Sequence, residues 1–427
     1  MRFSPPTPVP RRHPDVVDAD LGGDRLLLHR GTRRLHVLNP SAARVWDELD
    51  GVSLRSELVV RVADAVGADP VLIRDDVWSI LDRFRAAGLA GHDLAEPRPV
   101  GPAGRKGRTG RRRPPAGCVR APRSGSWTAG LTRVCLGTDD PELAAALDRA
   151  LAPLRGGRPA DHLVVVRQRD DGRHEITLDD EEPVVTGSRL AALNRVVALV
   201  NDLAAGEADG PALHAGAVRI GERAVVLAGA SGRGKSTLTL ALAAAGAAYL
   251  TDEVTLLGPS DGRPGGSVAC RPFPRPISLK PGSFPLFADQ LDGQWAQPDR
   301  STPLSALEAS WRSTVRLIDP RRVGEVADEP VPLACVVAPH WRPGAACRAC
   351  RCAPLEAVEV LLGAAFESRD VVAGEVFRTL VRVAATTPVW RLTYGDLDEA
   401  VAAVGDLASQ AARVEVVSAS GGGLVGA

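Results

Sequence analysis

The sequence predicts a multidomain protein that combines α/β and α+β architecture, and three observations lead to this class. At 427 residues the chain is long enough for two or three domains. Its first part carries two strand-like segments followed by three short amphipathic helices, which is typical of a winged-helix domain. From about residue 129, strand and helix patterns alternate around an apolar run at 224–228 that leads into a glycine-rich turn and a helix.

Composition argues against several classes of protein. Hydrophobic residues make up 44% and charged residues 24%, as in ordinary globular proteins. The formal net charge of +0 gives no support for a nucleic-acid partner or an acidic membrane surface. No apolar run is long enough to span a membrane, and the first residues do not form a secretory signal. The seven cysteines are scattered and odd in number, so we expect no disulfide framework and a cytoplasmic protein.

The N-terminal region, residues 1–95, is predicted to form the winged-helix domain. Residues 1–20 are rich in proline and are expected to be loose. The predicted elements are strands at 25–29 and 34–38, a helix from Pro40 to Leu49, and helices marked by apolar positions within 54–66 and 77–84.

Two stretches of this region, HVLNPSAARVWDELDG at 36–51 and LDRFRAAGLAG at the end of the third helix, resemble the PqqD family. The resemblance implies a domain that binds the leader segment of a ribosomally made precursor peptide as an added strand. The peptide would lie along Arg34–Leu38 and the helix from Asp75 to Arg85. The alternatives are a domain for packing or dimerisation and a winged helix that reads DNA. Aspartates offset the arginines on the third helix, which weighs against DNA.

Residues 96–128 are predicted to be a flexible linker, because proline, glycine and arginine dominate and almost nothing can be buried. The basic run at 105–113 is interpreted as part of a solvated tether rather than as a site for a polyanion or an acidic peptide. A second folded region is expected at 129–417, followed by a disordered tail at 418–427.

Strand and helix patterns alternate through this second region. Helices are predicted at 141–151, 188–200, 235–245, 354–362, 371–383 and 397–407, and strands at 162–168, 174–178, 224–228, 249–257 and 389–394. Asp171-Gly172 is a hairpin signal between the first two strands. An apolar stretch at 212–218 runs into the strand at 224–228.

The stretch after that strand matches a phosphate-binding loop at every required position. The residues predicted to bind nucleotide are Gly229, Ala230, Ser231, Gly232, Arg233, Gly234, Lys235, Ser236 and Thr237. The glycines let several backbone N–H groups point at one anion, and the following helix adds its N-terminus. Lys235 is placed to reach the β- and γ-phosphates of ATP, and the Ser236 hydroxyl to ligate Mg²⁺. Lysine occurs only at 106, 235 and 280 among 52 basic residues, so its presence here indicates a need for its compact charge.

The stretch Tyr249–Leu257 has two adjacent acids, Asp252 and Glu253, between apolar flanks and is predicted to be one strand. At least one carboxylate then lies where water is scarce, which is costly unless it meets a metal or a cation. Asp252 follows Lys235 by only 17 positions, a spacing that suits kinases whose second strand supplies the acid facing the γ-phosphate. The alternative is that Asp252 merely caps a turn.

The segment LHAGAVRIGERAVVLAGASGRGKSTLTLALAAAGAAYLTDEVTLL, together with PFPRPISLKPGSF at 272–284, resembles the HPr kinase/phosphorylase core and its relatives. The resemblance, over about residues 130–410, implies an ATP-dependent protein serine kinase with a nucleotide site like that of phosphoenolpyruvate carboxykinase. It assigns His214 as the active-site histidine, and Asp252 with Glu253 as paired acids where the family has two aspartates. The family's kinases assemble as oligomers, so a homo-oligomer is compatible with the resemblance.

These residues define a predicted mechanism of phosphoryl transfer. Mg²⁺ is expected on Ser236 and Asp252. Asp252 is expected to accept the proton of the attacking hydroxyl, while His214 positions that acid or donates to the phosphoryl oxygens. Since Glu253 replaces an aspartate, the choice of the base between the two acids stays open.

Weaker signals lie downstream. Arg275 and Lys280 are candidate phosphate or substrate contacts, with plain surface charge as the alternative. The CRACRC run supplies one Cys-x-x-Cys pair without a second pair, so a zinc site is the less favoured interpretation.

Three functions fit the sequence. The first is an HPr-kinase-type serine/threonine kinase that phosphorylates a ribosomally made precursor peptide, or a small protein, captured by the PqqD-like domain. The second is a small-molecule P-loop kinase, which shares the spacing from Lys235 to Asp252. The third is a non-catalytic nucleotide-binding adaptor in peptide maturation, which Glu253 beside Asp252 keeps open. The sequence does not name the phosphate acceptor.

Overall fold

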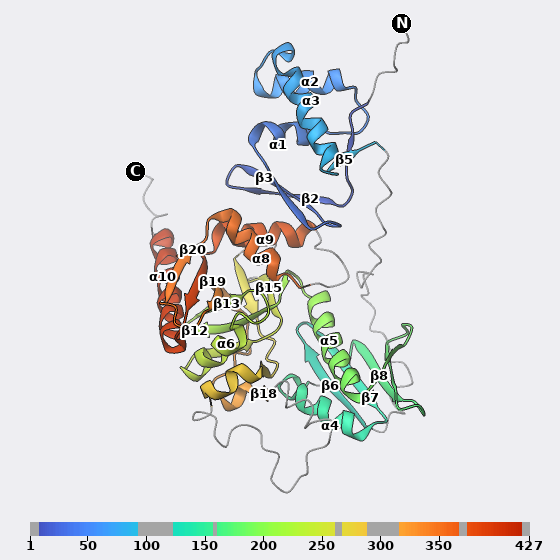
Figure 1. The fold of residues 1–427 in the computed structure, drawn as a ribbon, viewed down its shortest axis with the longest axis vertical. Helices are drawn as coiled ribbons and strands as arrows, with labels where there is room; N and C mark the ends of the chain where they lie inside the picture. Colours follow the sequence, from blue (N-terminus) through green and yellow to red (C-terminus); the bar gives the residue numbers. More distant parts are fainter. Residues whose placement is uncertain are drawn as a thin grey trace. The chain divides into compact units, whose positions relative to one another are not determined.

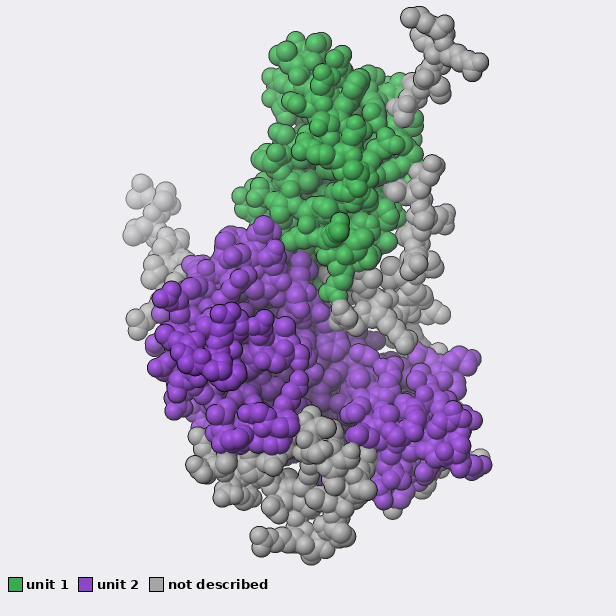
Figure 2. Space-filling model, in the orientation of Figure 1, with its two compact units in different colours: residues 1–103, 369–385 green, residues 104–368, 386–427 purple. Residues whose placement is uncertain are grey.

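The computed structural model describes residues 8–92, 123–156, 160–260, 267–287, 316–366 and 374–420. The chain divides into two compact units: unit 1 holds residues 1–103 and 369–385, and unit 2 holds the remainder (Figure 2). Both units mix helices with sheets (Figure 1), so the predicted multidomain α/β and α+β class is confirmed. The domain limit at 95 remains a prediction, and the segments at 96–128 and 418–427 are corrected below.

Unit 1 is built on a small antiparallel sheet and three helices that pack on one core. Its elements are β1 (Arg11–Arg12), β2 (Val16–Leu21), β3 (Asp24–His29), β4 (Arg34–Leu38), α1 (Pro40–Asp47), α2 (Arg55–Val66), α3 (Pro70–Ala86), β5 (Ala90–Gly91) and most of α9 (Gly374–Thr386). Strands pair in the order β2-β3-β4, with β1 and β5 as a separate pair.

The predicted hairpin of β3 and β4 is confirmed, but the expectation that residues 1–20 are loose is wrong for β2. Val16 to Leu21 pair antiparallel with His29 to Asp24 across the turn Gly22-Gly23. Both glycines have positive φ, which a two-residue hairpin turn requires. Polar residues alternate along β2, so its apolar signal was weak.

Capping residues set where the helices of unit 1 begin. The Asn39 side chain accepts from the Ala42 amide at 2.9 Å, directly before Pro40. The Asp69 side chain likewise accepts from the Val71 amide at 2.8 Å, directly before Pro70. Helix α3 therefore starts earlier than the apolar positions at 77–84 indicate. Trp46 is the centre of the core and meets Phe84 edge-on, with ring centroids 5.5 Å apart.

Unit 2 begins with a five-stranded sheet covered by two helices. The elements are β6 (Arg123–Ala129), β7 (Thr132–Thr138), α4 (Pro141–Ala150), η2 (Ala152–Leu154), β8 (His162–Gln168), β9 (His174–Leu178), β10 (Val184–Thr186) and α5 (Arg189–Gly206). The strand order is β10-β9-β8-β7-β6. β6 corrects the predicted linker at 96–128: its last residues form a strand because Trp127 is buried in the core that α4 and α5 share. Residues 96–122 lie outside the described residues.

A nine-stranded sheet forms the rest of unit 2. Its strands are β11 (Ala212–Leu213), β12 (Ala215–Ile220), β13 (Arg223–Ala228), β14 (Ala248–Thr251), β15 (Thr255–Pro259), β16 (Val268–Arg271), β19 (Val331–Trp341), β20 (Arg348–Arg351) and β21 (Val389–Tyr394). The helices are α6 (Lys235–Ala244), α8 (Pro354–Ala364) and α10 (Leu397–Ser420), with η3 (Pro281–Phe287), η4 (Pro320–Arg322) and the pair β17 (Ile277–Leu279) and β18 (Arg316–Ile318) beside them.

The strand before the phosphate loop lies inside this sheet. β13 runs parallel to β19, which runs parallel to β21, while β12 pairs antiparallel on the other side of β13. The carboxyl ends of β13, β19 and β21 therefore share one edge of the sheet. Val225 and Leu227 of β13 pack in one core with Leu238 of α6 and Val404 of α10, which fixes α6 against the sheet.

Three predicted boundaries need correction. Tyr249–Leu257 is not one continuous strand. The strand is interrupted between β14 and β15, where Thr251 Oγ1 donates to the Val254 carbonyl at 3.0 Å. The apolar stretch at 212–218 likewise holds two strands, separated by His214. The predicted disordered tail at 418–427 is helical as far as Ser420, and residues 421–427 lie outside the described residues.

Within the described ranges, no helix combines the length and the apolar character that a membrane crossing needs.

Close approach of β12 to α6 generates a first prediction. A Cβ at Gly216 would lie 2.3 Å from Thr239 Oγ1, and Thr239 is fully buried. We expect Gly216→Ala to lower the free energy of unfolding by about 1–3 kcal/mol, because the helix must shift to admit the methyl group. Chemical denaturation measures this change. Gly187→Ala is the control, since a Cβ there meets nothing within 4 Å, and equal effects of both substitutions would contradict the prediction.

Candidate active site

The glycine-rich turn connects β13 to α6 at the shared sheet edge. Gly232 and Gly234 adopt φ of 80° and 94°, in the left-handed region that favours glycine. Gly234 is also the residue that precedes α6, and a Cβ there would lie 2.5 Å from Tyr394 Oη. Glycine is therefore required at 234 both by backbone conformation and by the tyrosine packed beside it.

Lys235, the first residue of α6, is folded onto this turn. Its Nζ donates to the carbonyls of Gly229 at 2.7 Å and Ala230 at 3.2 Å, and only 6% of the residue is exposed. Burial lowers the pKa of Lys235, while nearby Glu253 and Asp252 oppose the shift. The ammonium group is thus held at the phosphate loop, where an anion would meet both it and the amides of the helix N-terminus.

Asp252 lies in the break between β14 and β15 and is 2% exposed. Its Oδ2 accepts from the Ser278 amide at 2.9 Å. Its Oδ1 is buried and has no hydrogen-bond partner among the described residues. Burial raises the pKa of Asp252 to about 7, against the opposing effect of the Ser278 amide and the Ser236 hydroxyl. The result is a buried carboxyl group with one satisfied oxygen and one that lacks a partner.

This oxygen fits a hard cation. Mg²⁺ prefers oxygen ligands and keeps waters and substrate phosphates in its shell, so a protein supplies few ligands. The Asp252 carboxyl group and the Ser236 hydroxyl interact with each other at the phosphate loop, and both offer oxygen atoms to a cation. The described residues contain no cluster of three or more His, Cys, Asp or Glu side chains suited to a metal. Any ion here would therefore depend on the phosphates for much of its coordination.

His214 and Glu253 form a second pair at the site. His214 lies between β11 and β12, where its amide donates to the Ala364 carbonyl at 2.6 Å. Its Nδ1 is 3.4 Å from Glu253 Oε1, and both side chains are about one-third exposed. Burial lowers the pKa of His214, with Glu253 opposing it and Lys235 adding to it. The two acids are therefore not equivalent: Asp252 is buried against an amide, and Glu253 meets a histidine.

The two predicted basic contacts differ in position. Arg275 is 4% exposed and its Nη1 donates to Asn201 Oδ1 of α5 at 2.8 Å, so the alternative of a plain surface charge is wrong for it. The Arg275 carbonyl also accepts from the Tyr249 hydroxyl at 2.6 Å. Lys280 is exposed, and its Nζ donates to Ser231 Oγ at 3.1 Å, which places it on the phosphate loop.

Several residues at the site were not predicted from the sequence. Ser278 and Ser283 both occur in or beside the quoted segment at 272–284, and Ser283 Oγ contacts Thr237 Oγ1 at 2.7 Å. Their position in that segment was the available signal. Asn201 and Tyr394 lie far from the loop in sequence, and nothing in their local pattern marks them.

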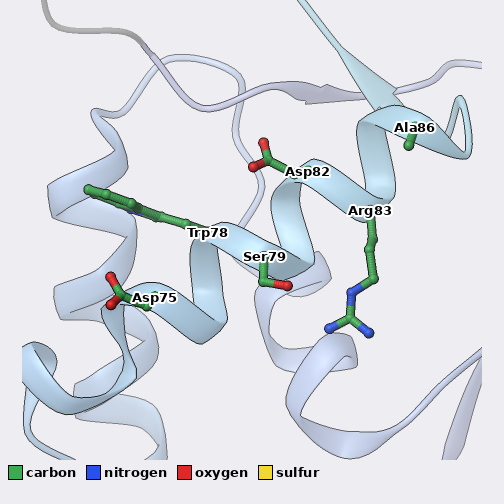
Figure 3. Close-up of a pocket in the computed structure, with 6 residues that line it drawn as sticks. All are labelled: Asp75, Trp78, Ser79, Asp82, Arg83 and Ala86. Atoms are coloured by element: carbon green, nitrogen blue, oxygen red, sulfur yellow. The ribbon is translucent and has the colours of Figure 1, made fainter.

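A different surface lies in unit 1, on the helix α3. Asp75, Trp78, Ser79, Asp82, Arg83 and Ala86 line an open depression of about 590 Å³ (Figure 3). Trp78 is 38% exposed, which is unusual for so large an apolar side chain. In the same unit, β4 is an edge strand: it pairs only with β3 within the described residues. A free edge and an exposed aromatic are features of peptide-binding domains.

Comparison with known proteins supports the PqqD resemblance seen in the sequence. Residues 25–90 match the family model for coenzyme PQQ synthesis protein D, so this part of the chain is a PqqD domain. A search of curated proteins returned no match.

Two solved structures cover different parts of the chain. TbiB1 in complex with the TbiA(beta) leader peptide is 21% identical, covers 20% of this chain and 99% of its own, and has a TM-score of 0.18. The Hpr(Ser) kinase/phosphatase from Coxiella burnetii is 13% identical, covers 48% of this chain and 97% of its own, and has a TM-score of 0.24. Both scores are low, so the chemistry must be inferred from the site itself.

The buried Asp252 predicts a pH dependence of stability when divalent cations are removed by a chelator. Its folded-state pKa of about 7 lies above the ordinary 3.8. Its contribution to stability is therefore full below the ordinary value and is lost as the pH rises through about 7. Asp252→Asn removes this loss, and we expect it to exceed the parent in unfolding free energy at about pH 8 by roughly 2–4 kcal/mol.

Denaturation at about pH 5 and pH 8 tests this expectation, with the difference between variant and parent as the measured quantity. Glu222→Gln, at a side chain that is 95% exposed, is the control and should show no such difference. An Asp252→Asn protein that is equally destabilised at both pH values would contradict the account.

Proposed function

We propose that this protein is an ATP-dependent phosphotransferase that phosphorylates a serine or threonine of a ribosomally made precursor peptide, or of a small protein, held by its PqqD domain. One observation carries the proposal: the buried carboxyl group of Asp252 interacts with the Ser236 hydroxyl in the first turn of α6 and keeps one oxygen, Oδ1, without a partner among the described residues. A phosphate loop alone would indicate only nucleotide binding. The buried acid adds a group that can hold a cation or accept a proton where the phosphate ends.

The phosphate donor would be held by groups already in place. The amides of the loop and of the first turn of α6 would donate to one anion, and Lys235, which is already buried, would add a positive charge without further desolvation. When bound, Mg²⁺ would neutralise charge on the phosphates, with Ser236 and Asp252 as its protein ligands. The exposed Lys280 is hydrogen-bonded to Ser231 and would add a second ammonium group at the loop.

The acceptor hydroxyl needs a base as its oxygen bonds to the γ-phosphorus and the bond to the β-phosphate oxygen breaks. Asp252 has one available atom for this, Oδ1, because Oδ2 accepts from Ser278. The same atom cannot both ligate the cation and take the proton. If Oδ1 ligates, the proton falls to Glu253, which His214 holds at 3.4 Å. The two acids thus have separate assignments that substitution can distinguish.

The PqqD domain would supply the acceptor. An extended peptide can add to the free edge of β4, where main-chain hydrogen bonds give affinity, while side chains meet the depression around Trp78. A peptide tethered in this way reaches a high effective concentration at the phosphate loop, so the catalytic unit need not bind it tightly. This division of labour supports a peptide or protein acceptor over a free metabolite.

Transfer of labelled phosphate from ATP tests the proposal. We expect Lys235→Ala and Asp252→Asn to lower kcat by at least about 100-fold, because each removes charge stabilisation or proton transfer in the transition state. Glu253→Gln should cause a comparable loss only if Glu253 is the base. Exposed Glu222→Gln is the control.

The acceptor found in that assay separates the alternatives. Label on a peptide or protein supports the proposal, and label on metabolites alone indicates a small-molecule kinase. Nucleotide binding without transfer to any acceptor indicates an adaptor and would contradict the proposed activity.

Peptide capture is tested independently of transfer. We expect Trp78→Ala to weaken binding of a candidate leader peptide roughly tenfold or more, because exposed aromatics are typical anchors of an interface. Fluorescence titration of the labelled peptide measures the affinity. Val52→Ala, at a residue that is 79% exposed outside the depression, should bind like the parent. Equal affinities of all three proteins would show that the depression is not part of the peptide site.

A further inference from the structure

A half-exposed tryptophan stands at the end of β19, next to the phosphate loop. Leu227 of β13 is in register with Val337 of β19, and β19 continues from there to Trp341. A Cβ at Gly234 would lie 3.7 Å from Trp341 Cβ, so the tryptophan backbone is against the loop. Trp341 is 50% exposed. The proposed mechanism makes no use of this side chain.

Two arginines converge beside it. Arg233 of the loop and Arg342 both contact Nε2 of His340, the latter at 3.2 Å. Within the described residues neither arginine has a carboxylate partner in an ion pair. Partial burial and these two charges lower the pKa of His340, and its Nε2 accepts a hydrogen bond from Arg342 Nε. Among the described residues, the cluster therefore brings two positive charges without a carboxylate partner next to an aromatic surface.

Backbone bonds hold this cluster in place. The Arg342 amide donates to the Tyr394 carbonyl at 2.8 Å, and the Ala345 amide donates back to the Arg342 carbonyl at 3.1 Å. Gly395 lies under the same turn, where a Cβ would come 2.6 Å from the Ala345 nitrogen. The turn after β19 is thus fixed against the end of β21. Trp341 and Arg342 are presented from a rigid edge rather than from a free loop.

The other side of the phosphate loop, where β12 lies, carries the residues assigned to the cation and the acceptor. β12 pairs with β13 on that side and β14 with β12, and the break after β14 carries Asp252 and Glu253. The cation and the acceptor hydroxyl belong there. In open α/β sheets, a nucleotide extends along the carboxyl ends of the parallel strands. The remaining part of the donor, beyond its phosphates, must then extend toward the ends of β19 and β21.

We propose that Trp341, Arg233 and Arg342 form the nucleoside subsite of the phosphate donor. The indole stacks on the purine ring, and the guanidinium groups meet the α-phosphate and ribose. This proposal rests on the proposed function and names the residues that bind the non-reacting part of its donor. Stacking does not depend on base-edge hydrogen bonds, so these residues accept any purine nucleotide. Loss of the indole would weaken binding of nucleotides without affecting ligands that consist of phosphates alone.

Calorimetric titration of the full chain with Mg·ADP and with Mg·tripolyphosphate tests the proposal. We expect Trp341→Ala to weaken ADP binding roughly 5- to 100-fold, the range for loss of one base–aromatic stack. Tripolyphosphate, which has no base, should bind within about twofold of the parent. Trp341→Phe should retain most of the ADP affinity, because phenylalanine also stacks. Lys235→Ala should weaken both ligands, and Val52→Ala, at an exposed residue of the PqqD domain, should weaken neither.

Each other result counts against a specific claim. Unchanged ADP affinity in Trp341→Ala, with both ligands lost in Lys235→Ala, overturns the nucleoside subsite and leaves the proposed function standing. Equal losses of ADP and tripolyphosphate in Trp341→Ala also overturn it, because the tryptophan would then merely support the loop. Failure of the parent protein to bind either ligand overturns the proposed function and this inference together.

Discussion

Unit 2 depends on one electrostatic constraint: the carboxyl group of Asp252 is inside the protein, and its Oδ1 has no hydrogen-bond partner among the described residues. Removing a charge from water is costly unless it is paired, so this group is neutral or must meet a cation. The surrounding residues are arranged about it. Asp252 lies where the strand is interrupted, and the Ser278 amide donates to one of its oxygens. Arg275, hydrogen-bonded to Asn201 of α5, adds positive charge nearby. Because α5 packs on the first sheet of unit 2, that sheet helps to fix the position of Arg275 near Asp252.

In the proposed function, recognition and chemistry are divided between the two units. Among the described residues, unit 1 offers an edge strand with one free side and an exposed tryptophan. Unit 2 offers buried charges and a rigid phosphate loop. A peptide-binding surface must tolerate varied sequences, whereas phosphoryl transfer needs atoms held within a narrow range of positions. Placing the two tasks on separate units lets each meet its own physical requirement.

The sequence was most informative where local chemistry dictates local structure. The phosphate loop, the capped helices and the β3–β4 hairpin follow from glycine, proline and periodicity, and all were predicted. Less was predictable where contacts between residues distant in sequence determine the local structure. Asp252 looked like a strand residue because its flanks are apolar, but the bond from the distant Ser278 amide accompanies a break there. Asn201 and Tyr394 reach the site only through the fold, so no local pattern could reveal them.

The packing of Tyr394 against Gly234 has a consequence for synthesis of the chain on the ribosome. The loop at 229–234 emerges long before β21, yet the surface that shapes one side of it belongs to β21. The central strand β19 also precedes its partner β21. A nascent chain would therefore carry a loop that lacks this packing surface until β21 is translated. Under the proposed function, nucleotide binding by the growing polypeptide would then report the pairing of β21 with β19.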